Sequence, residues 1–66
     1  MIYNFTATAE TESGEREFGS TVNTEPEGEN FRPVFEAARQ LAIKHAQREG
    51  YPPDSVTVTE ISYVSP

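Results

Sequence analysis

The sequence has no cysteine, no tryptophan and only one histidine, and these absences exclude several kinds of site. Without cysteine the chain can form neither a disulfide nor a thiolate metal site, and one histidine is too few for the usual zinc ligand sets. No stretch approaches the roughly 20 apolar residues of a membrane-spanning helix, and the N-terminus lacks the basic start and apolar run of a secretion signal. We therefore expect a cytoplasmic protein that binds no metal or cofactor.

Basic residues are also scarce. The 66 residues include eleven acids and five bases, which gives a net charge of −6. This excess opposes binding to nucleic acid or to an anionic membrane, so the expected partner is a protein with a basic surface. A chain of this length predicts one small domain, residues 1–66, with one thin core and no deep cleft.

Two segments of alternating apolar and polar residues, 2–10 and 15–24, predict a β-hairpin. Ser13-Gly14 lies between them and has the residue types of a tight turn. A turn centred on these two residues pairs Phe5 with Val22 and puts the apolar residues of both strands on one face. A three-residue loop would separate the two apolar sets, so burial favours the two-residue turn.

This predicted register places four glutamates on the polar face of the hairpin end, with Glu10 opposite Glu17 and Glu12 opposite Glu15. Directly opposed like charges destabilise a pair of strands. One interpretation is a charged end that resists edge-to-edge association. A second interpretation is an acidic patch that binds a basic surface. A third is weak binding of a divalent cation, although the spacing of the glutamates lacks the pattern of a calcium loop.

Residues 31–49 predict one amphipathic helix. Asn30 can cap its start and Gly50 suits the position just past its end. The apolar stripe expected to pack on the hairpin is Phe31, Val34, Phe35, Ala38, Leu41, Ala42 and His45, with Ala46 at its edge and Ile43 outside it. We interpret His45 as half-buried near the helix end, since no Ser, Cys or second His accompanies it in a catalytic motif, and we expect no enzymatic activity.

A third strand is predicted at residues 55–64. Together the elements predict an α+β domain of ββαβ topology, in which one helix covers a three-stranded antiparallel sheet of order 2-1-3.

The alternation in this third strand slips by one residue between Val58 and Ile61. A bulge near Thr59-Glu60 would turn Ile61 and Tyr63 into the core and Glu60 outward. An unbroken strand would instead expose Ile61 and Tyr63 beside Ile2 on the open face of the sheet, as an apolar patch for a partner or a second copy. Either way, the third strand is a free sheet edge.

The segment Val58-Thr59-Glu60-Ile61, the final Pro66 and the order of the elements resemble the bacteriophage inhibitors of bacterial RNA polymerase. In that family, arginines of the last strand contact the polymerase, whereas the matching positions here hold Glu60 and Ser62. The chain is also similar in size and acidity to anti-CRISPR proteins, which cover nucleic-acid-binding surfaces. A third resemblance, in the hairpin, helix and strand, is to acidic antitoxins. The first two resemblances imply a viral protein that inhibits host machinery.

Two functions follow as hypotheses. The first is an acidic binding module that inhibits a host protein by covering its surface. The partner-binding residues expected for it are Glu10, Glu12, Glu15, Glu17, Ile2, Ile61 and Tyr63. The second is a structural or assembly role through homo-oligomerisation of the sheet, with a homodimer as its simplest form.

Overall fold

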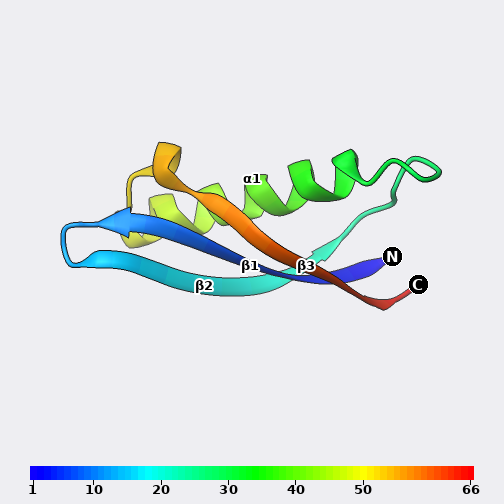
Figure 1. Ribbon diagram of the computed structural model, residues 1–66, viewed down its shortest axis with the longest axis horizontal. Coiled ribbons are helices and arrows are strands. Elements are labelled where there is room, and N and C mark those ends of the chain that lie inside the picture. The colour runs from blue at the N-terminus through cyan, green and yellow to red at the C-terminus, as the bar shows by residue number, and fades with distance from the viewer.

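The computed structural model describes residues 1–66 as two strands, a helix and a final strand (Figure 1). The elements are β1 (Ile2–Thr11), β2 (Gly14–Asn23), α1 (Arg32–Glu49), a short 3₁₀ turn η1 (Pro53–Ser55) and β3 (Thr57–Ser65). The sheet is antiparallel with the order β2-β1-β3, and α1 lies along one face of it. The predicted α+β fold and strand order are confirmed.

The core lies between β1 and α1. Every second residue of β1 is buried, namely Tyr3, Phe5, Ala7 and Ala9. The helix contributes a row at four-residue spacing, namely Val34, Ala38, Ala42 and Ala46, each at most 1% exposed. Three of these four are alanines, so the core is thin.

This row explains why the predicted helix stripe is partly wrong. A spacing of four residues advances 400° around the helix, so each row member is rotated 40° from the one before. The contact line therefore winds around α1. Phe31 and Phe35 at its start are each 50% exposed, and Leu41 is 38% exposed. Ile43, which the stripe excluded, packs against the core.

The helix begins one residue later than predicted, whereas its end follows from the sequence. Phe31 is the N-cap residue and its side chain makes no capping hydrogen bond, while Asn30 Oδ1, one residue earlier, accepts a hydrogen bond from the backbone N–H of Arg32 at 3.1 Å, as in an Asx turn. At the other end Gly50 adopts φ = 80°, a left-handed conformation that glycine adopts without strain. The N–H of Tyr51 then donates to Ala46 O and that of Gly50 to Gln47 O, which satisfies two terminal carbonyls.

The hairpin turn lies one residue earlier than predicted, which shifts every cross-strand pair by two residues. Thr11 pairs with Gly14, so Glu12 and Ser13 form the turn, and Gly14 follows with φ = 104°. Tyr3 now faces Val22, where the sequence analysis placed Phe5. A shift of two residues preserves the faces, which is why the prediction of shared apolar faces holds although the register is wrong.

The third strand contains the bulge. Val58 pairs with Ala7 and Glu60 with Thr6, so Thr59 is the extra residue, and Ile61 consequently pairs with Phe5 on the core face. A second irregularity, at Val64, was not expected. Ile61 and Tyr63 therefore do not join Ile2 on the open face, and the apolar patch expected there for an unbroken strand does not form.

Candidate functional site

The face of the sheet opposite α1 is the candidate site, and the strand registers define its residues. Polar side chains occupy most of its positions, namely Asn4, Thr6, Thr8, Thr21, Asn23, Thr57, Ser62 and Ser65. Its charged positions are Glu10, Glu15, Glu17 and Glu60, which are all exposed, and none holds Lys or Arg. We call these four residues the acidic face.

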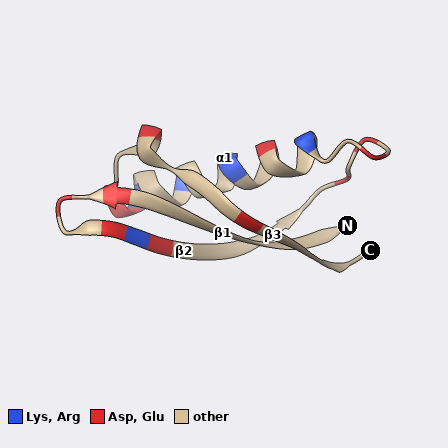
Figure 2. Ribbon diagram, viewed as in Figure 1, with Lys and Arg blue, Asp and Glu red and all other residues tan.

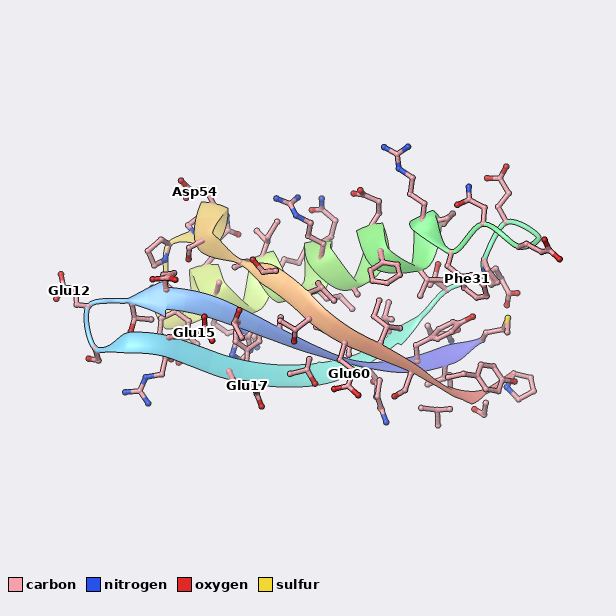
Figure 3. The ribbon with its side chains drawn as sticks, in the orientation of Figure 1. Glu12, Glu15, Glu17, Phe31, Asp54 and Glu60 are labelled. Atoms are coloured by element: carbon pink, nitrogen blue, oxygen red, sulfur yellow. The ribbon has the colours of Figure 1, made fainter.

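The closest pair on the acidic face is Glu10 and Glu15, which sit directly opposite each other on β1 and β2. Opposed side chains on antiparallel strands have their Cβ atoms about 5 Å apart, so these carboxylates repel each other. Glu17 lies one step further along β2, opposite Thr8. Glu60 lies on β3 opposite Thr6, and Figure 3 shows it and Glu17 pointing away from α1.

The predicted ladder of four opposed glutamates is therefore wrong. Glu10 faces Glu15 and not Glu17, and Glu12 has no strand partner because it occupies the turn. Glu60 is not among the predicted partner-binding residues, because it lies on β3 and the predicted acidic patch lies on the hairpin. The bulge at Thr59 was the available signal, since it turns Glu60 to the same face as Glu17.

Positive charge lies elsewhere on the molecule. Arg16 pairs with Ala9, so it projects from the side of the sheet that α1 covers. The remaining Lys and Arg residues are all on α1, and Figure 2 shows their positions in blue along this helix, above the sheet. The one ion pair joins the N-terminal amine to Glu25 at 2.8 Å, so the acidic face has no internal basic partner.

Exposed apolar side chains gather at the opposite end of the molecule from the hairpin turn. Phe31, Phe35, Tyr63 and Val64 are each 50–54% exposed. The start of α1 and the end of β3 both lie at this end, beside the chain termini (Figure 1). The ring of Tyr63 meets Tyr3 edge-on, with ring centroids 5.7 Å apart.

Helix geometry places Phe35 on the β3 side of α1. His45 comes just before the buried Ala46 and stacks on Phe18 of β2, with ring centroids 4.5 Å apart. A residue that precedes a buried row member, as His45 does, is rotated 100° to the β2 side of the row. A residue that follows one is rotated 100° to the opposite side, so Phe35, which follows Val34, turns toward β3. This surface could not be predicted from a straight helix stripe, which places Phe31 and Phe35 in the core.

His45 is half-buried, as predicted, and its ring stacks on the ring of Phe18. No Ser hydroxyl or carboxylate is hydrogen-bonded to it. The arrangement accounts for His45 as a packing residue between α1 and β2.

Comparisons with models of protein families, with curated proteins and with solved structures found no match to this chain. The site is therefore interpreted from its own chemistry.

The structure contains no enclosed pocket and no group of three or more His, Cys, Asp or Glu side chains arranged to hold a metal ion. No helix has both the length and the apolar character needed to cross a membrane. What the acidic face presents is a set of free carboxylates among hydroxyl and amide groups, which can accept hydrogen bonds from Lys and Arg side chains of another molecule.

Proposed function

We propose that this protein is a binding module that docks its acidic face onto a basic surface of a partner protein and inhibits the partner by covering that surface. The observation that carries the proposal is the opposed pair Glu10 and Glu15, with Glu17 and Glu60 on the same face and no basic residue among them. A pair of like charges lowers the stability of a thin domain. A partner that supplies positive charge would offset this repulsion between Glu10 and Glu15, which gives the pair a role.

The geometry suits recognition of a surface with several basic groups. The four carboxylates extend from the hairpin end along β2 and across to β3, so they offer separate positions for Lys or Arg. Such complementarity between potentials speeds association and excludes wrong partners. A surface built to hold phosphates presents this kind of array, which agrees with the resemblance to small phage inhibitors that occupy nucleic-acid-binding surfaces.

The test separates the acidic face from net charge. One variant carries Glu10→Gln, Glu15→Gln and Glu17→Gln. A matched control carries Glu27→Gln, Glu29→Gln and Glu36→Gln, which changes the net charge equally at exposed positions elsewhere.

Tagged wild type, face variant and control are used to capture proteins from bacterial lysate, and retained proteins are identified by mass spectrometry. We expect a partner that the wild type and the control retain and the face variant loses, and that 0.5 M salt releases, since salt screens exposed charge pairs over about 4 Å at that concentration. Equal loss from both variants would mean that net charge alone is responsible. Retention by the face variant would refute the proposal.

A further inference from the structure

The hydrogen bonds of the sheet show which backbone groups of β2 are free. The N–H of Thr24 donates to Met1 O at 2.9 Å, so the pair Met1 and Thr24 is hydrogen-bonded, and every second pair along β1 and β2 follows it. Odd-numbered residues of β1 therefore bond to β2. Even-numbered residues bond toward β3, as shown by the Thr59 hydroxyl, which donates to Thr6 O at 3.3 Å.

The same alternation leaves half of the backbone of β2 without a partner. Its even-numbered residues bond to β1. Its odd-numbered residues direct their N–H and C=O groups outward from the sheet edge, namely Glu15, Glu17, Gly19, Thr21 and Asn23. At position 19 the chain requires glycine, because a Cβ there would lie 2.8 Å from the carbonyl oxygen of Phe5 on β1.

The two edges of the sheet differ. The edge strand β3 is interrupted at Thr59 and at Val64, and such bulges hinder pairing with another strand. By contrast, β2 pairs with β1 one to one from Gly14 to Asn23, without a bulge or a proline. The edge that is open to pairing is therefore β2, not the third strand that the sequence analysis pointed to.

We propose that β2 pairs antiparallel with β2 of a second copy of this chain, about a two-fold axis at Gly19. The result is a continuous six-stranded sheet with both helices on the same face. In this register Gly19 faces Gly19, Thr21 faces Glu17 and Asn23 faces Glu15 of the other copy. Every free N–H of the edge then meets a free carbonyl.

Charge favours pairing with a second copy about an axis near Gly19 over an axis closer to the hairpin turn. The charged residues of β2 lie in its first half, Glu15 to Glu17, and its second half, Phe18 to Asn23, is uncharged. Antiparallel pairing about Gly19 places the charged half of β2 in one copy opposite the uncharged half of β2 in the other copy. An axis at Arg16 would instead oppose Glu15 to Glu17 of the other copy, and an axis at Glu17 would oppose the two Glu17 side chains.

The acidic hairpin turns do not oppose this dimer. Ser13 is six residues from Gly19, so each turn lies about 20 Å from the axis, and the two turns are about 40 Å apart. This separation is several times the Debye length of about 8 Å at physiological ionic strength.

The dimer also covers apolar side chains at the β2 side of the core. Phe18 is half-buried, and Leu41, which precedes the buried Ala42, turns to this side and is 38% exposed. In the proposed dimer, Phe18 lies diagonal to its equivalent, within reach of an aromatic contact.

The first test is sedimentation velocity from about 10 μM to about 1 mM, together with amide hydrogen exchange by NMR at both concentrations. We expect a monomer–dimer equilibrium in which the amides of Gly19 and Thr21 exchange more slowly at high concentration, while that of Ser20, already bonded to β1, does not change. The proposal would be overturned if the protein were a monomer at 1 mM, or if amide exchange slowed at high concentration only in β3.

Variants at Thr21 test the register. Thr21→Lys places a cation opposite each Glu17 and is expected to tighten dimerisation about fivefold, because the dimer has two such pairs. Thr21→Glu is expected to weaken it by a similar factor, and Thr21→Val is the control that keeps the charge unchanged. Equal dimerisation by the Lys and Glu variants would refute the Gly19 register.

A last variant removes only the outward donor. Thr21→Pro deletes an N–H that faces solvent in the monomer, and proline is tolerated at such edge positions. Dimerisation should be lost while the circular dichroism spectrum of the monomer is retained. A variant that dimerises as the wild type does would contradict the proposal, and if this variant fails to fold, the Thr21→Lys and Thr21→Glu pair decides.

Discussion

The opposed glutamates Glu10 and Glu15 allow a direct measurement of what the acidic face costs the fold. The substitution Glu15→Lys replaces a repulsive cross-strand pair by an attractive one. Cross-strand charge pairs contribute about 0.2–1 kcal/mol, and exposure to solvent keeps both contributions near the lower limit. The expected total gain in the free energy of unfolding is about 0.5 kcal/mol.

This gain is measurable because the domain is small. An entropy of unfolding of about 2.1 cal/mol/K per residue gives about 0.14 kcal/mol/K for the whole chain. The melting temperature of Glu15→Lys should therefore rise by about 4 °C at low salt. Thermal unfolding followed by circular dichroism, at about 20 mM and about 1 M NaCl, is the assay.

The matched control is Glu27→Lys, which changes the net charge equally in the exposed loop before α1. The difference in melting temperature between the two variants should be about 4 °C at low salt and should shrink at 1 M NaCl, where the Debye length is about 3 Å. Equal shifts for both variants would show that overall charge, and not the opposed pair, determines the effect. A difference that survives high salt would refute the electrostatic reasoning.

Two further predictions test the packing and the bulge. Ala38→Leu, at a position that is 0% exposed, should lower the free energy of unfolding by about 1–3 kcal/mol through overpacking, whereas Phe35→Ala should lower it by under about 1 kcal/mol. Urea unfolding measures both changes. A larger loss from Phe35→Ala would show that Phe35 belongs to the core, as the straight helix stripe predicts. Deletion of Thr59 should give a folded protein, because Val58 and Glu60 remain on their present faces of the sheet. Deletion of Ser62 should unfold the protein, because it turns Tyr63 away from the core face. The dispersion of amide signals in an NMR spectrum distinguishes the outcomes, and two equally unfolded variants would contradict the bulge at Thr59.

The sequence was sufficient for those features that depend on periodicity and local chemistry. The alternation in residues 2–10 predicted the central strand, Gly50 predicted the helix end, and the slip before Ile61 pointed to the bulge. Each depends on a steric property of a few neighbouring residues, such as the left-handed conformation that Gly50 adopts.

Features that depend on how elements cross one another could not be obtained in this way. The hairpin register differed by two residues, because Ser13-Gly14 and Glu12-Ser13 are both acceptable turn centres and both keep the apolar faces together. The exposure of Phe31 and Phe35 depends on the angle between α1 and the sheet, which the row of alanines sets. Since Glu60 joins Glu17 only across three strands, the acidic face likewise required the assembled sheet.

The position of the first strand at the centre of the sheet has a consequence for the order of folding. The hairpin of β1 and β2 closes over a two-residue turn, but the contact between Thr59 and Thr6 spans 53 residues of sequence. Closing so long a loop costs more conformational entropy than closing the turn. This entropy is lost before the contacts of β3 form and can offset it. We therefore expect the hairpin and helix to assemble first, so that β1 passes through a stage in which one of its edges is unpaired. In this order of folding, the strand at the middle of the finished sheet is itself an edge until the nine residues of β3 pair with it.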